Sequence, residues 1–181
     1  MPTADTGFLS SYASLHPAGD GASRQRRTVV LIDPAQLVIE APQWRADPQA
    51  ISAAERAMLT IRLEHALRGA TARLPPAPAA RAVRIRAAVT RVVTVSPAFN
   101  TVASLMLVGP VDRGGAAVEV EAIDALTGEQ LAAINIGYFA PMSELKARFS
   151  ALAPAALAMD RAAAAFAPLL EISENREAAA R

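Results

Sequence analysis

Strict alternation of apolar and polar residues marks three segments of the chain as strands that have one face in a core. These segments are 82–95, 116–124 and 131–139. Their inward-facing residues are expected to be Val83, Ile85, Ala87 and Val89, then Val118, Val120 and Ala122, then Ile134, Ile136 and Tyr138. Arg91 interrupts the first of these sets, which predicts a β-bulge at that position. Glu119 and Glu121 fall on the other side of the second strand, where we expect them to face water.

An earlier strand and a long helix are indicated ahead of these segments. Residues 28–40 are β-branched and apolar, but Pro34 cannot donate a ladder hydrogen bond, so this strand should bend there. Ser52 and Glu55 then form the capping-box pattern that begins a helix, because each can bind an unpaired amide of the first turn. The helix should run to the proline pair 75–76, with one apolar face made of Leu59, Leu63, Leu67, Ala70 and Leu74.

A last helix near the C-terminus completes the element order. It is expected to begin at Ser143, to be interrupted at Pro154, to resume through Phe166 and to fade in the polar tail. Residues 97–109 are compatible with a strand or with a helix, and both alternatives stay open. The order β-α-β-(β)-β-β-α predicts an α+β fold: a largely antiparallel or mixed sheet of about four to five strands with helices packed on one face.

The 181 residues fit one domain, which is long enough to bury a core without disulfides or metals. We expect an N-terminal arm and linker over 1–27 that is partly docked on the core, a single α+β domain over 28–172, and a polar tail over 173–181. The segment 16–27 is rich in turn-forming residues and is expected to be a flexible connection. Docking of the arm is expected because four apolar side chains left in water would each forgo roughly 1.5–3 kcal/mol of burial: Phe8, Leu9, Tyr12 and Leu15.

Composition and charge argue against several classes of function. The net charge is +1 and the arginines are interspersed with acidic residues, so nucleic acid is not an expected partner. No apolar run reaches the ~18 residues of a membrane-spanning helix. The chain has no cysteine, and its two histidines, His16 and His65, lie far apart in the sequence. We therefore expect no catalytic centre, no metal site, no cofactor and no enzymatic activity.

The segment EAIDALTGEQLAA raises the question of whether an acidic catalytic loop lies between the last two strands. A phosphoryl-transfer site would also need a glycine-rich phosphate loop and a second carboxylate, and the nearby GPVDRGG lacks the required spacing. A hairpin turn explains the segment better. Asp124 can accept backbone amides where the turn begins, Thr127 lies within it, and Gly128 can adopt positive φ at its end. We interpret these three residues as structural.

Charged residues on the outer faces of the strands allow two interpretations. Glu119 and Glu121, together with Arg84 and Arg86, could act as acid-base groups or as a ligand clamp. Opposite charges on adjoining strands are, however, ordinary cross-strand partners, and we favour that interpretation.

Aromatic side chains give the best candidate for a binding surface. Phe8 and Tyr12 in the arm and Trp44 in a proline-flanked loop are predicted to form one exposed patch, since aromatic anchors bury much area with little loss of rotamer freedom. The alternative is that these rings complete the core. In that case Trp44→Ala would destabilise folding without a separate loss of binding.

Three segments together resemble a known protein family. TGFLSSYASL, VVLIDPAQLVIE and VEVEAIDALTGEQLAA, in this order and at about these separations, are similar to the bacterial lipoprotein-like proteins grouped as domain of unknown function 3313. The resemblance runs from Thr6 to the last helix. It implies an exported precursor with a lipidated cysteine just ahead of TGFLS, a position at which this chain has no cysteine. The implied location is the periplasm, with membrane attachment by a lipid anchor at the outer membrane in the full-length form only.

The resemblance implies no activity, so two functions remain. The first is a non-enzymatic accessory or binding module at the bacterial outer membrane, with an envelope protein or another cell-envelope component as partner. The alternative is a periplasmic carrier of a lipid-like or small apolar ligand. A cavity lined by Met58, Met106 and the inner face of the sheet would favour the carrier, whereas a solid core with an exposed aromatic patch would favour the binding module.

Overall fold

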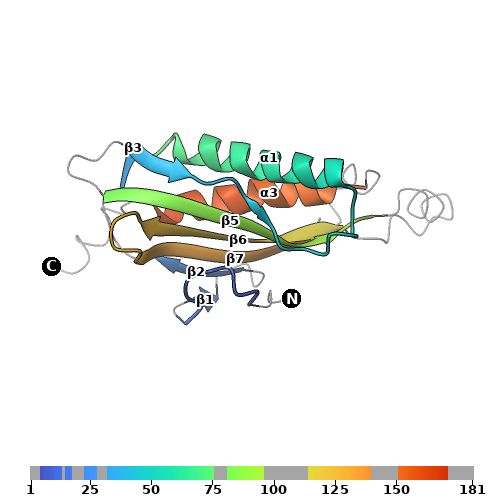
Figure 1. Ribbon diagram of the computed structural model, residues 1–181, viewed down its shortest axis with the longest axis horizontal. Helices are drawn as coiled ribbons and strands as arrows, with labels where there is room; N and C mark the ends of the chain where they lie inside the picture. Colours follow the sequence, from blue (N-terminus) through green and yellow to red (C-terminus); the bar gives the residue numbers. More distant parts are fainter. Residues whose placement is uncertain are drawn as a thin grey trace.

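The computed structural model describes residues 5–13, 15–17, 23–27, 32–75, 81–95, 114–139 and 151–170. In this part of the chain, one sheet carries the helices α1 and α3 on one of its faces (Figure 1). The elements, in chain order, are β1 (His16–Pro17), β2 (Ser23–Arg27), β3 (Ile32–Ile39), β4 (Gln43–Trp44), α1 (Ala53–Thr71), β5 (Arg81–Val93), β6 (Gly115–Asp124), β7 (Gln130–Phe139), α3 (Ala153–Phe166) and the 3-10 turn η2 (Ala167–Leu169). The ambiguous segment 97–109, Ser143 and the polar tail lie outside the described residues.

The sheet is mixed and open. Its strand order is β1-β2-β7-β6-β5-β3, and β4 also pairs with β5. β3 and β4 run parallel to β5, whereas the other neighbouring strands pair antiparallel. The predicted α+β class, with a mixed sheet and helices on one face, is confirmed.

Short strands lie where the sequence did not indicate them. β1 and β2 fall within the segment 16–27, so the interpretation of their residues as a flexible connection is wrong. β2 pairs with β7 from Ser23 opposite Ile136 to Arg27 opposite Ala132, and this pairing gives its backbone groups partners. Turn-rich composition reports a local preference, whereas here a strand from a distant part of the sequence decides the conformation. The third short strand, β4, pairs with β5 farther along than β3.

The core lies between the helices and the inner face of the sheet. α1 contributes Leu59, Leu63 and Leu67, which are fully buried as their spacing predicts. Phe166, at the end of α3, is also fully buried in this core. The inward-facing residues predicted for the three alternating strands all belong to it, with Tyr138 half-buried at its margin.

Local irregularities of the backbone follow the sequence. Ser52 and Glu55 form the predicted capping box at the start of α1. The register between β5 and β6 shifts between Val89 and Arg91, which confirms the predicted bulge. The register of β3 against β5 also shifts, in the stretch that contains Pro34.

One helix boundary differs from the prediction, and another lies next to residues outside the described ranges. α1 ends at Thr71, ahead of the proline pair, although Leu74 remains buried beyond its end. α3 begins at Ala153 and holds Pro154 in its first turn. A proline there removes no intrahelical hydrogen bond. Residues 140–150, where the part of this helix ahead of Pro154 was expected, lie outside the described residues, so the interruption stays a prediction.

The segment between β6 and β7 forms a hairpin turn, as the sequence indicates. β6 ends at Asp124, and its Oδ1 accepts the backbone N–H groups of Leu126 and Thr127, both at 2.9 Å. The hydrogen bonds from Thr127 and Leu126 hold the pKa of the Asp124 carboxyl below its ordinary value. Gly128 has a φ of 74°, and β7 begins at Gln130.

Replacing Gly128 by alanine should lower the free energy of unfolding by on the order of 1 kcal/mol, because a Cβ is strained at positive φ. A Cβ at Gly128 would meet no other atom within 4 Å, so the backbone strain alone sets the effect. Gly69 in α1 is the matched control, since it has the same open space without positive φ. Gly69→Ala should instead stabilise the protein by about 0.5–1 kcal/mol. Urea unfolding measures both, and shifts of the same sign would contradict the prediction.

Candidate functional site

The outer face of the sheet, opposite the helices, carries a polar layer that the N-terminal segment covers. Residues 5–13, called the arm from here on, lie on this face (Figure 1). Beneath the arm, Glu119 and Glu121 of β6 have 0% exposure. The prediction that both glutamates face water is therefore wrong. Alternation along β6 sets the face on which they lie, but it does not report what covers that face.

Strand register places the polar residues under the arm in two neighbouring rows. The rows are Arg86, Glu121 and Ala133, and then Ala88, Glu119 and Asn135, each from β5, β6 and β7 in that order. Gln130, at the start of β7, lies beside the first row and donates to Glu121. The surface under the arm is called the seat from here on and comprises Arg86, Glu119, Glu121, Gln130 and Asn135.

Glu121 binds the middle of the arm. Its Oε2 accepts the backbone N–H of Ser10 at 2.8 Å, and its Oε1 accepts the Ser10 hydroxyl at 3.0 Å. Gln130 Nε2 donates to the same carboxylate at 2.8 Å, and Arg86 Nη1 forms an ion pair with it at 3.0 Å. The expected cross-strand pair of Arg86 and Glu121 is thus present, whereas Arg84 pairs with Glu40 at 3.1 Å.

Glu119 binds both ends of the arm through hydroxyl groups. Its Oε2 accepts the hydroxyls of Thr6 and Tyr12, both at 2.8 Å, and its Oε1 accepts Asn135 Nδ2 at 3.1 Å. No ion pair involves Glu119 in the described part of the chain. Burial raises the pKa of the Glu119 carboxyl above its ordinary value, although the hydrogen bonds from Thr6 and Tyr12 oppose this.

The Tyr12 hydroxyl also closes the arm upon itself. It accepts the backbone N–H groups of Phe8 at 3.0 Å and of Leu9 at 3.2 Å while it donates to Glu119. Phe8 and Leu9 are buried in a small apolar cluster with Ala88 and Ala133 of the sheet, separate from the main core. Docking of the arm, expected from its apolar residues, therefore also depends on two buried carboxylates that the sequence analysis placed in water.

The three aromatic residues predicted to form one exposed patch are divided between the two faces of the sheet. Phe8 is only 3% exposed, and the Arg86 guanidinium lies over its ring at 5.1 Å from the centroid. Tyr12 is half-buried on the same outer face. Trp44 is half-buried against the main core on the helix side of the sheet. The rings therefore complete packing on two opposite faces and form no common surface.

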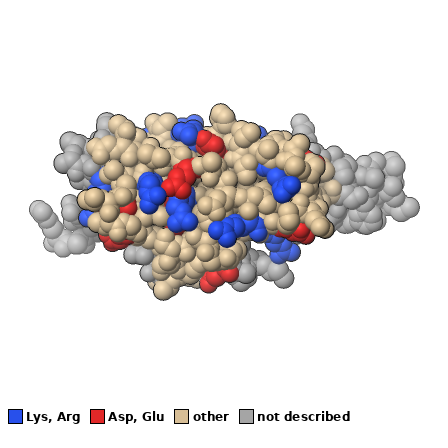
Figure 2. All heavy atoms as spheres, in the orientation of Figure 1, with Lys and Arg blue, Asp and Glu red and all other residues tan. Residues whose placement is uncertain are grey.

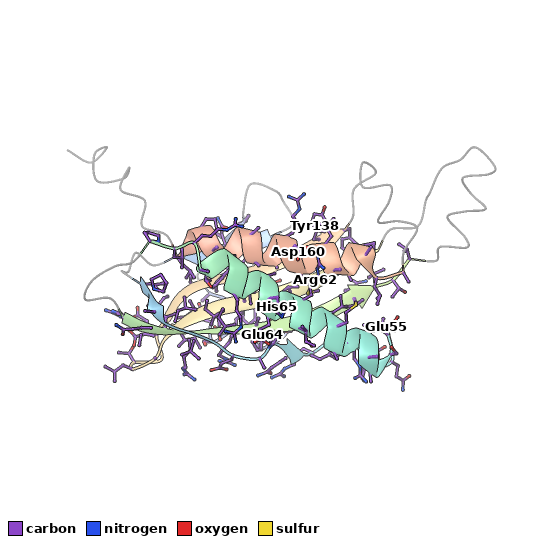
Figure 3. All side chains as sticks on the ribbon, turned by 90° about the horizontal axis from the view of Figure 1, so that it is seen from above. Glu55, Arg62, Glu64, His65, Tyr138 and Asp160 are labelled. Atoms are coloured by element: carbon purple, nitrogen blue, oxygen red, sulfur yellow. The ribbon has the colours of Figure 1, made fainter. Side chains whose placement is uncertain are left out.

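The charged groups of the helix side are more exposed than those of the seat. Arg62 of α1 faces Asp160 of α3 (Figure 3), with Nη2 to Oδ2 at 2.6 Å and Nε to Oδ1 at 3.1 Å. The hydrogen bonds to Asp160 raise the pKa of Arg62. His65 is exposed on α1 next to Glu64 (Figure 3). On the face that Figure 2 shows, basic and acidic side chains are interspersed.

The described residues contain neither a cluster of metal ligands nor a membrane-spanning helix. No group of three or more His, Cys, Asp or Glu side chains in these residues is placed to hold a metal ion. None of the helices described is long and apolar enough to cross a bilayer.

The stability of the protein should depend on pH through Glu119. Because burial raises the pKa of this carboxyl above 4.5, its contribution favours the folded state at low pH and is lost as pH rises from about 4.5 through the raised pKa. Glu119→Gln removes this titration. The quantity to compare is the free energy of unfolding of the wild type minus that of Glu119→Gln. This difference should fall as pH rises over this window, by at most about 1.4 kcal/mol per pH unit. Urea titrations at several pH values measure this difference. A rise of this difference with pH would contradict the prediction.

Comparison with known proteins places the chain in a family. The model of a family described as "Protein of unknown function (DUF3313)" matches residues 4–166. The chain belongs to this family. The match confirms the resemblance found in the three sequence segments.

Solved structures of similar fold include PelC from Paraburkholderia phytofirmans, crystallised as a dodecamer. PelC is 14% identical to this chain, with 81% of this chain and 98% of PelC covered and a TM-score of 0.50, so the likeness shows the fold alone. A candidate lipoprotein from Caulobacter crescentus CB15 is 16% identical, with 75% and 84% covered and a TM-score of 0.32. Comparison with curated proteins gave no match.

Proposed function

We propose that this chain is the body of a periplasmic lipoprotein, held at the bacterial outer membrane by a lipid ahead of the arm, and that it acts as a non-enzymatic binding module for an envelope protein. The observation that carries the proposal is the seated arm. Thr6, Ser10 and Tyr12 fix the arm to buried carboxylates of the central strand β6. A lipid attached ahead of the arm would therefore hold the body in a defined orientation.

That orientation supports α1 as the surface for a partner. The arm and the helices lie on opposite faces of the sheet (Figure 1). An anchor ahead of the arm would bring the outer face of the sheet toward the bilayer and turn α1 away from it. α1 exposes Met58 and Ile61, at 46% and 55%, on neighbouring turns of the helix. A partner that buries these two side chains would gain their hydrophobic contribution at this surface.

The carrier has less support. Met58 is 46% exposed on α1, and Met106 lies outside the described residues. Buried side chains of the helices fill the inner face of the sheet, among them Leu63 and Phe166. These observations favour the binding module over the carrier.

Fatty-acid labelling tests the anchor. Cells that express the complete reading frame with its natural upstream sequence are grown with an alkyne fatty acid, and their membranes are separated on a density gradient. We expect the label on this protein and the protein in the outer-membrane fraction. Replacing the cysteine expected ahead of the arm by serine should abolish both. An unlabelled wild-type protein that does not sediment with membranes would reject the anchor.

Site-specific photocrosslinking tests the partner surface. A photoreactive residue replaces Met58 or Ile61 in the lipidated protein, and Glu129 in the exposed turn is the matched control position. We expect adducts with one envelope protein from the two α1 positions only. PelC is described as a dodecamer, so self-association through this surface is the alternative. An adduct of twice the mass of this chain would mean that the partner is a second copy of this chain and not an envelope protein. Equal adducts from position 129, or none from α1, would reject α1 as the binding surface.

A further inference from the structure

We propose that the arm is a releasable strap: it docks on the seat and leaves it as one cooperative unit, while the sheet and helices beneath stay folded. The proposal goes beyond membrane attachment and concerns an equilibrium within the chain itself.

Side chains of the seat form the hydrogen bonds that hold the arm in place. Among the described residues, Thr6 and Tyr12 donate to Glu119, Ser10 donates to Glu121, and Gln130 donates to the carbonyl oxygen of Ser11. None of these bonds belongs to the strand ladders. Release of the arm therefore breaks no pairing between β5, β6 and β7, and the layer beneath can remain intact.

The apolar contacts of the arm are also separate from the main core. Phe8 and Leu9 pack with Ala88 and Ala133 on the outer face, while the main core lies on the inner face. Segments with few buried apolar contacts open at lower free energy than the core of the same protein. The arm can thus open without opening the core.

One oxygen atom links the hydrogen bonds of the arm, and this makes the release cooperative. The Tyr12 hydroxyl accepts from Phe8 and Leu9 and donates to Glu119, which also accepts from Thr6. Loss of this oxygen removes the bonds that fold the arm and one bond that fixes it to the seat. Ser10, which follows Leu9 directly, should then lose its alignment with Glu121.

The buried carboxylates bring the docked and released states close in free energy. Glu119 has no ion pair in the described part of the chain, and burying such a group opposes docking even when it is hydrogen-bonded. Release returns Glu119 and Glu121 to water and removes this cost. An apolar seat of the same area would hold the arm more firmly.

Release would lengthen the connection between the body and whatever holds its N-terminus. The nine residues 5–13, if extended, span at most about 30 Å. This consequence for reach from the membrane rests on the proposed function. The docking equilibrium does not, because it can be measured on the chain in solution with no membrane present.

Residue-resolved amide hydrogen exchange tests the strap. Tyr12→Phe removes the linking oxygen, and Tyr138→Phe is the matched control, because the Tyr138 hydroxyl forms no hydrogen bond in the described residues. In Tyr12→Phe we expect the amides of Phe8, Leu9 and Ser10 to exchange at least about ten-fold faster. The amides of β6 and β7 should stay better protected than those of the arm, and Tyr138→Phe should leave the arm unchanged.

A second variant tests cooperativity directly. Thr6→Val keeps the shape of the side chain but removes its bond to Glu119, while the bond from Ser10 to Glu121 is untouched. A strap that moves as a unit predicts that the Ser10 amide nevertheless exchanges about three- to ten-fold faster. A Ser10 amide at the wild-type rate in both Thr6→Val and Tyr12→Phe would overturn the proposal. So would a Ser10 amide that opens at the same free energy as the β6 and β7 amides in the wild type. Either result would leave the fatty-acid test of the anchor unaffected.

Discussion

Glu121→Ala is expected to lower the free energy of unfolding by about 2–4 kcal/mol, because it removes an acceptor shared by the arm, β5 and β7. Ser10 and Gln130 would lose their partner in a buried site, and Arg86 would lose its ion pair. The Arg86 side chain is 28% exposed, so water can hydrate part of its charge. The expected loss is therefore smaller than for a fully buried pair.

Matched variants separate this effect from the general effect of charge removal. Glu129 carries the same charge in the exposed turn at 3.5 Å from Arg81, and Glu129→Ala should change stability little. Glu121→Gln keeps one acceptor oxygen and should fall between the wild type and Glu121→Ala. Urea unfolding measures all three variants. A Glu121→Ala protein as stable as the wild type would show that the seat contributes nothing to folding.

The sequence predicted the inner half of the fold well. Positions such as Leu63 and Val120 repeat with the period of their own helix or strand, and that period reports which face is buried. The capping box at Ser52 and the turn at Gly128 were also predictable, because both depend on residues that are neighbours in the sequence. β2 was not predictable, because its strand conformation depends on β7.

The seat could not be predicted, because its contacts join distant parts of the chain. Thr6 and Glu119 are 113 positions apart, and Tyr12 and Glu119 are 107 apart. Alternation put both glutamates on the outer face correctly, but it carried no information about a covering segment. A signal was present in TGFLSSY, where hydroxyl-bearing residues lie on both sides of the apolar pair Phe8 and Leu9. The apolar residues were interpreted as the reason for docking, and the hydroxyls, which bind the carboxylates, were left without a role.

Phe166→Ala should produce the largest loss of stability, about 3–5 kcal/mol, because it leaves a cavity in the main core. Phe166 is fully buried at the end of α3, among side chains of both helices and the sheet. Phe139 at the end of β7 is 39% exposed and is the matched control. Phe139→Ala removes the same atoms from a site that water already reaches, so its loss should stay below about 1 kcal/mol. Urea unfolding measures the difference between the two variants.

The same variant tests whether the two faces of the sheet are energetically separate. If the arm opens independently of the core, Phe166→Ala should speed exchange of the β6 amides, which open only on global unfolding, and leave the Ser10 amide near its wild-type rate. Tyr12→Phe should instead speed exchange of the Ser10 amide. Thermodynamic additivity of the two changes in a double variant would follow, since sites without shared contacts add within about 0.5 kcal/mol. A coupling well above that value would mean that Glu119 and Glu121 transmit the packing of the helix side to the arm, and the arm would then be part of one cooperative fold.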